Sequence, residues 1–316
     1  MKPDLFHPDN FTRGQKHRIE LEISADIRIP VLLARGDTDG KTLVATAAVH
    51  GDEYEGVQAI FECFEELDTG KMSGDLLAIP VANPPAFFAG ARLSPLDNAN
   101  LARCFPGALD AGPTDAIAWY LDHFVLARAD FYVDLHSGGV GFLMPTMAGY
   151  DLTDPRSIAA ARISGFPVIW GHPVIGPGRT ISSARQRGIP FLYTEARGCG
   201  RVVDEDLALF RCILGNLLMH LSILPGSPQT TPIQHHLIGD GSIERGLISK
   251  HHAFFIPRVS LLDRVTAGQV LGIVTDTLGG CLEEIVSSVD GVIALIHAFR
   301  VVKPGDPLFV VTGLAA

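Results

Sequence analysis

The sequence lacks paired cysteines. Its five cysteines are an odd number and include no C-x-x-C pair, being Cys63, Cys104, Cys199, Cys212 and Cys281. This pattern argues against a disulfide framework and against a cysteine-based zinc site. We therefore expect reduced thiols and a cytoplasmic location.

Positive charge and long apolar runs are also scarce. Lys and Arg number 25 against 35 Asp and Glu, a formal net charge of -10, which argues against nucleic-acid or anionic-membrane partners. Residues 1–14 lack the apolar core of a signal peptide. The most apolar helix-like run, 207–224, contains Arg211, Asn216 and His220, so a packed helix is favoured over a membrane span.

Strands and helices alternate through the first part of the chain, which predicts an α/β domain over 1–226. A Pro-rich and Ser-containing stretch at 224–232 indicates a linker. From about 236 onward, short β-like runs are split by Gly and Pro. They predict a small all-β domain over 233–316.

The most informative stretch is His50-Gly51-Asp52-Glu53. It follows an apolar run at 42–49, which predicts a buried strand, and precedes a helical apolar pattern at 54–67. His50 and Glu53 should therefore lie at the carboxyl end of a strand, where open α/β sheets bind ligands. An imidazole and a carboxylate on one such turn can reach the same metal ion.

Two further strands end in residues of the same chemical type. The run 131–135 leads into His136, and the run 189–194 leads into Glu195. His50, Glu53 and His136 would supply the two-His, one-carboxylate set of a catalytic zinc site. Glu195 would take the proton of an activated water, and Asp134 could orient His136 from behind.

Two irregular segments supply candidate cations. No regular structure is expected at Asn83-Pro84-Pro85, and a long functional loop is expected over 86–112. Arg92 and Arg103 lie in this loop with Asn100, and Arg179 lies in a second Gly/Pro-rich loop. Any of the three arginines could stabilise an oxyanion or bind a substrate carboxylate.

Each candidate also has a purely structural interpretation. His136 could be a hydrogen-bonded core histidine, Asp52 could cap the following helix, and Glu195 could pair with Arg197. Ser137 invites a serine-nucleophile interpretation, but no G-x-S-x-G turn surrounds it. The joint occurrence of two histidines and a glutamate at predicted strand ends favours the metal site.

These motifs resemble the succinylglutamate desuccinylase/aspartoacylase family, the deacylase branch of the zinc carboxypeptidase-like folds. HGDE at 50–53, DLHSG at 134–138 and TEARG at 194–198 resemble its two zinc motifs and its catalytic-glutamate segment. NPPAFFAGAR at 83–92 and NLARCFPG at 100–107 resemble two further family stretches. The resemblance spans roughly residues 42–200.

The resemblance implies a mixed open sheet flanked by helices, one Zn²⁺ per chain, and hydrolysis of an N-acyl amino acid. It implies that Arg92 stabilises the transition state and that Arg103 grips the substrate carboxylate. One position departs from the family: Ala102 stands where Asn usually precedes that arginine. Asn100 and Arg179 are additional candidates for substrate contact.

The C-terminal domain resembles a barrel-like or biotinyl/lipoyl hammerhead domain. A carrier would need a lysine for its prosthetic group, and residues 265–300 contain none, so a structural or dimerisation role is expected. A homodimer is the default oligomer. The rivals to a deacylase are a carboxypeptidase on the same fold and a zinc-containing binding protein without turnover.

Overall fold

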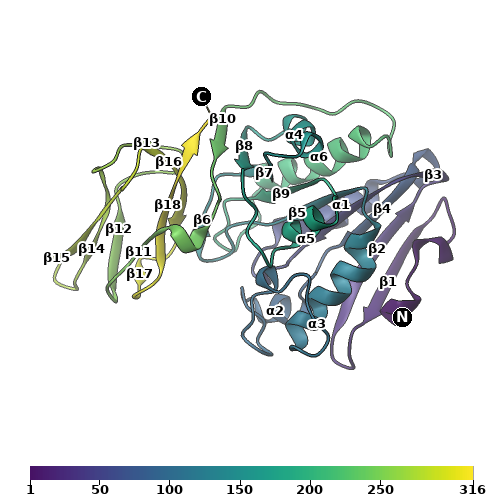
Figure 1. Cartoon of the computed structure of the whole chain (residues 1–316), viewed down its shortest axis with the longest axis horizontal. Helices are drawn as coiled ribbons and strands as arrows, with labels where there is room; N and C mark the ends of the chain where they lie inside the picture. Colours follow the sequence, from purple (N-terminus) through teal and green to yellow (C-terminus); the bar gives the residue numbers. More distant parts are fainter. Residues whose placement is uncertain (316) are drawn as a thin grey trace.

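The computed structural model describes residues 1–315, which form a long mixed sheet with helices on both faces and a β-rich C-terminal end (Figure 1). This confirms the predicted fold class. The first nine strands are β1 Lys16–Glu22, β2 Arg28–Arg35, β3 Thr38–Ala47, β4 Ser73–Ile79, β5 Phe131–Leu135, β6 Phe142–Leu143, β7 Met147–Asp151, β8 Val168–His172 and β9 Phe191–Glu195.

The centre of the sheet is built from parallel neighbours. β3 lies between β4 and β5, and β9 follows β5, all in parallel register. These strands are apolar on both faces, as expected where helices cover both sides. The helices are α1 Glu55–Glu66, α2 Pro84–Ala89, α3 Pro113–Tyr120, α4 Pro155–Arg162, α5 Thr180–Gln186 and α6 Asp204–His220.

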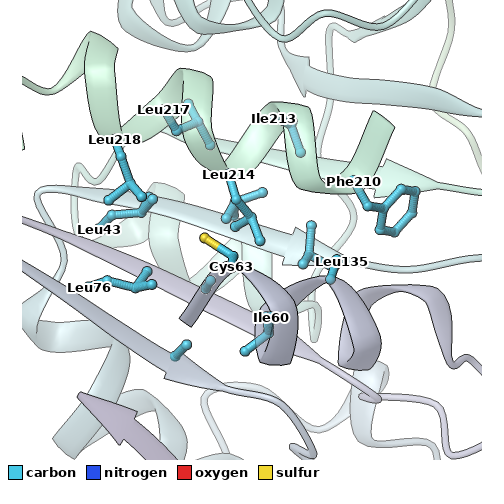
Figure 2. Packing of buried hydrophobic residues seen from close by; sticks show 14 of the residues in the cluster. Leu43, Ile60, Cys63, Leu76, Leu135, Phe210, Ile213, Leu214, Leu217 and Leu218 are labelled. Atoms are coloured by element: carbon cyan, nitrogen blue, oxygen red, sulfur yellow. The ribbon is translucent and has the colours of Figure 1, made fainter. Parts of the chain in front are cut away.

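Each face of the sheet has its own core. Alternate residues of β3 separate into the two cores, with Leu43 on the face of α1, α4 and α6 and Val44 on the face of α3 and α5. Figure 2 shows Leu214, Leu217 and Leu218 of α6 packed near Ile60 and Cys63 of α1 and against the strands. Each buried leucine contributes about 1.5–3 kcal/mol relative to exposure, so apolar packing fixes α1 behind the His50 turn.

The segment expected to be irregular at 83–112 is partly helical. Pro84 and Pro85 begin α2, and the Asn83 side chain accepts a hydrogen bond from Ala86 N at 3.4 Å. The expectation was wrong because proline is tolerated in the first helical turn, whose N–H groups have no intrahelical partner. A 3-10 turn at Leu101–Arg103 also interrupts the loop.

The C-terminal strands continue the sheet. β10 pairs in parallel with β8 and antiparallel with β18, so hydrogen bonding passes directly from the first part of the chain into the second. The division at 224–232 remains a prediction. These strands are β10 His235–Ile238, β11 Leu247–Ile248, β12 Ala253–Pro257, β13 Arg264–Val265, β14 Val270–Thr275, β15 Cys281–Val286, β16 Gly291–His297, β17 Val301–Val302 and β18 Pro307–Leu314.

The short β-like runs predicted after about residue 236 correspond to strands such as β12, β14, β15, β16 and β18. A four-stranded sheet of β15, β14, β12 and β17 shares an apolar core with β16 and β18, including Phe255 and Phe309. Among residues 1–315, the helices are too short or too polar for any of them to cross a bilayer.

Candidate active site

Three adjacent strands bring the candidate residues to one edge of the sheet. His50 and Glu53 lie on the turn between β3 and α1, and His136 directly follows β5. Ala47 of β3 is paired with Leu135 of β5, so these two strand ends are side by side. Glu195 is the last residue of β9, the next parallel strand. All four side chains line the same cavity.

His50, Glu53 and His136 form a compact donor set. Each offers a ligand atom, and these atoms lie within 4.8 Å of one another. Glu53 Oε2 lies 2.9 Å from His136 Nδ1 and accepts a hydrogen bond from Ser137 N at 3.2 Å. Two imidazoles and one carboxylate are a donor set that catalytic zinc sites use, with a position left for water. The residues present therefore fit a zinc ion.

The surroundings of the two histidines differ. Burial, together with Arg92, holds the pKa of His50 well below its usual value, which keeps the imidazole neutral as a metal ligand must be. Its Nδ1 lies 3.4 Å from the Arg92 carbonyl oxygen. Burial would also lower the pKa of His136, but the carboxylates of Asp134 and Glu53 raise it well above its usual value.

Asp134 lies directly behind His136. Its Oδ2 is 2.9 Å from His136 Nε2 and also accepts a hydrogen bond from the Thr180 hydroxyl, while its Oδ1 accepts one from the Thr46 hydroxyl. The carboxylate is fully buried. This contact fixes which imidazole nitrogen faces the donor set, because Nε2 is engaged by Asp134 and Nδ1 faces Glu53.

Glu195 is a partly buried carboxylate, one oxygen of which has no partner within residues 1–315. Its Oε2 is inaccessible and has no hydrogen-bond partner among the described residues. Burial, and then the nearby charge of Glu53, raise the pKa of Glu195 well above its usual value. A carboxylate that lines a cavity and has an oxygen without a hydrogen-bond partner is suited to accept a proton from a water or a substrate group there.

The three arginines predicted from the sequence also line this cavity. Arg92 Nη1 donates to Glu53 Oε1 at 3.3 Å, and Arg103 is bound to Glu244. Arg179 makes no hydrogen bond or ion pair with the described residues through its guanidinium. Asn100 does not line the cavity, because its side-chain oxygen accepts a hydrogen bond from Ala102 N at 3.0 Å and caps the 3-10 turn there.

Several other residues of the cavity wall were missed by sequence reasoning. Tyr193, two residues before Glu195, could have been found from strand alternation, which puts it on the same face. The other residues come from distant segments with no motif to mark them. These additional wall residues include Phe142, Met144, Trp170, Ile181, Gly241 and Ile243.

Tyr193 is held by His172, the last residue of β8. His172 Nδ1 is 2.6 Å from the Gly239 carbonyl oxygen, so Nδ1 carries the proton. Its Nε2, 2.6 Å from the Tyr193 hydroxyl, must then accept the Tyr193 proton. Burial lowers the pKa of His172 to about 4, which agrees with a neutral ring.

This arrangement predicts a pH-dependent stability. The pKa of His172 is about 4 in the folded protein against about 6.5 unfolded, so the unfolded chain binds a proton first as the pH falls. Stability should therefore be lost between about pH 6.5 and pH 4, by about 3 kcal/mol from this group. His172→Gln, which keeps a donor and an acceptor, should show a shallower loss of unfolding free energy over that range in urea titrations. Equal pH slopes for both proteins would contradict this.

Comparisons with known proteins agree with the geometry. The sequence profile of the succinylglutamate desuccinylase/aspartoacylase catalytic domain matches residues 39–221. The N-alpha-acetyl-L-2,4-diaminobutyric acid deacetylase of Halomonas elongata is 31% identical over 93% of this chain and 90% of its own.

Solved structures show the same fold over nearly the whole chain. A succinylglutamate desuccinylase from Silicibacter sp. TM1040 has a TM-score of 0.87 and 29% identity, covering 96% of both chains. The product-bound ectoine utilization protein EutE (DoeB) from Ruegeria pomeroyi has a TM-score of 0.87 and 28% identity, also covering 96% of both chains. The profile match and the Halomonas relative together establish that this chain belongs to the succinylglutamate desuccinylase/aspartoacylase family of deacylases.

Proposed function

We propose that this protein is a zinc-dependent deacylase that hydrolyses the amide bond of a small N-acylated amino acid. His50, Glu53 and His136 would hold one zinc ion. The observation that carries the proposal is the Glu195 carboxylate, which lines the same cavity as the three donors and has an oxygen without a hydrogen-bond partner among the described residues. A structural metal site would need no such carboxylate and is usually closed by four protein ligands.

Each residue then has a defined task. A zinc ion in this site would supply an acidified water and polarise the acyl carbonyl. Glu195 accepts the proton of the attacking water and returns it to the leaving nitrogen. Asp134 holds the His136 ring in place through Nε2. Arg92, which lies beside Glu53 and 5.8 Å from the Phe142 ring centroid, donates to the developing oxyanion.

Arg179 is the guanidinium proposed to bind the substrate carboxylate. It lines the cavity and makes no ion pair within residues 1–315, so its donors are available. The apolar side chains of Met144 and Ile181 line the same space. A guanidinium next to an apolar wall suits an amino acid that carries one carboxylate and a short hydrocarbon portion.

Arg179→Gln should raise KM for an N-acetyl amino acid about ten- to hundredfold, with a smaller change in kcat. One charge-assisted hydrogen bond is worth about 1.5–3 kcal/mol, and binding lost equally from ground and transition states appears in KM. Steady-state kinetics measure both constants. Arg185→Gln is the matched control on α5, because Arg185 pairs with Asp151 outside the cavity and should keep the wild-type KM. An unchanged KM for Arg179→Gln would contradict the assignment.

A substrate panel tests the proposed function against the carboxypeptidase alternative. The zinc-loaded protein would be given N-acetyl and N-succinyl amino acids, beginning with N-acetyl-L-2,4-diaminobutyrate because of the Halomonas relative, and dipeptides with a free carboxylate. Release of free amino acid from an N-acyl substrate is the expected result. Cleavage of the dipeptides alone would favour a carboxypeptidase, and no cleavage of any compound would favour a binding protein.

A further inference from the structure

Arg103 is occupied by a carboxylate of the protein itself. Its Nε and Nη2 donate to Glu244 Oε1 at 3.2 and 2.6 Å, and its Nη1 donates to the Ala102 carbonyl at 2.9 Å. All three nitrogens of the guanidinium are thus engaged. Glu244 binds this cavity-lining arginine much as a ligand carboxylate would.

Glu244 is held in this position by its own segment. Ser242 Oγ donates to its second oxygen, Oε2, at 2.9 Å. Burial would raise the pKa of Glu244, but hydrogen bonds from Arg103, the backbone and Ser242 lower it to about 2. The carboxylate is therefore ionised at any physiological pH and offers a fixed negative charge beside Arg103.

The segment 239–246 is itself fixed against the cavity wall. The Gly239 carbonyl is bound by His172, and Gly241, at φ +62, packs so closely on the His172 ring that an added Cβ would lie 2.7 Å from Cε1. Gly241 and Ile243 line the cavity. Glu244 directly follows Ile243 in the 3-10 turn Ile243–Arg245. Its side chain is more than half exposed and does not itself line the cavity, so Glu244 acts on the cavity through its ion pair with Arg103, which does line it.

Two of the three arginines that line the cavity are paired with carboxylates of the protein. Arg92 is paired with Glu53 and Arg103 with Glu244. Ala102 has no side-chain donor, although it also lines the cavity. Among the described residues that line the cavity, Arg179 is the guanidinium without an ion pair, so the cavity offers one full positive charge to a substrate carboxylate.

We propose that Glu244 is a specificity-determining residue that restricts the cavity to N-acyl amino acids with a single carboxylate and favours a cationic over an anionic side chain. The proposal rests on the deacylase function and names its substrate class. A second substrate carboxylate would have to displace Glu244 from Arg103 or lie beside its negative charge. An ammonium group at that place would instead be attracted to it.

The test uses three substrates of similar size whose side chains differ in charge. They are N-acetyl-L-2,4-diaminobutyrate, which is cationic, N-acetyl-L-glutamine, which is neutral, and N-acetyl-L-glutamate, which is anionic. For the wild type, kcat/KM should be highest for the cationic compound and lowest for the anionic one. Glu244→Gln should move the ratio of the cationic to the anionic substrate towards one by about fivefold, the size expected for a partly exposed ion pair. Glu283→Gln is the matched control. Glu283 of β15 forms an ion pair with Lys250, and neither of these two residues lines the cavity.

The outcomes separate this inference from the deacylase proposal. Hydrolysis with no charge preference, or a preference that Glu244→Gln leaves unchanged in a folded protein, would overturn the role of Glu244 while the deacylase proposal stands. If no compound is hydrolysed, the role of Glu244 is tested by calorimetric binding instead. L-2,4-diaminobutyrate, L-glutamine and L-glutamate are titrated into the wild type, Glu244→Gln and Glu283→Gln. Tighter binding of the cation that weakens in Glu244→Gln supports the inference, and equal or absent binding rejects it.

Discussion

Glu195→Gln should retain zinc at the wild-type level and lose about 10²–10⁴-fold in kcat, the usual contribution of a general acid–base. The amide has nearly the shape of the carboxylate but accepts no proton from water. Glu195 lies outside the three-donor group of His50, Glu53 and His136, so metal content should not change. Metal analysis and steady-state kinetics on the same preparation measure both quantities.

The control for this variant is Glu65→Gln. Glu65 is an exposed residue of α1 that pairs with Arg18, and its loss should leave kcat unchanged. A Glu195→Gln protein that turns over near the wild-type rate would exclude Glu195 as the proton acceptor. A variant that loses its zinc as well would mean that Glu195 contributes to holding the ion.

His50→Ala should abolish both zinc binding and hydrolysis. Removing one of three protein ligands leaves an incomplete site, and the remaining Glu53 and His136 donors already contact each other. Metal content after dialysis, together with hydrolysis of N-acetyl-L-2,4-diaminobutyrate, measures the effect. His220→Ala, at the end of α6 and outside the donor group, should keep both properties. Full zinc content in His50→Ala would refute the ligand assignment.

The order of strands and helices could be predicted because each apolar run has a period and a length that suit one element. The run before His50 became β3, and the helical pattern after it became α1. The candidate residues could be placed for the same reason: carboxyl ends of parallel strands converge at one edge. His50, His136 and Glu195 meet there although the first two are 86 positions apart in sequence.

Long-range contacts could not be predicted from the sequence. The segment 239–246 has no motif, yet β10 joins β8 directly and so brings that segment to the cavity. The Arg103–Glu244 pair spans 141 positions. No local pattern indicates such a contact, because both residues are ordinary charged residues in turns. The sequence therefore predicted that Arg103 binds the substrate carboxylate, and its ion pair with Glu244 was not foreseen.

The start of α2 was also predicted wrongly from the sequence. Pro84 and Pro85 were interpreted as breakers, whereas their position after Asn83 makes them the first turn of α2. Asn100 accepts a hydrogen bond from the backbone N–H of Ala102 through its side-chain oxygen, and its contact with substrate remains a prediction. In both places an asparagine side chain accepts a hydrogen bond at the start of a turn, and sequence alone did not reveal which role it takes.

The central claim is that hydrolysis depends on zinc held by His50, Glu53 and His136. The most direct measurement is N-acetyl-L-2,4-diaminobutyrate hydrolysis by the wild-type protein before and after zinc is removed with a chelator, and again after zinc is titrated back. The account predicts that activity disappears on removal and returns in proportion to bound zinc, reaching its maximum at about one ion per chain. Undiminished hydrolysis by protein shown to be free of metal would contradict it.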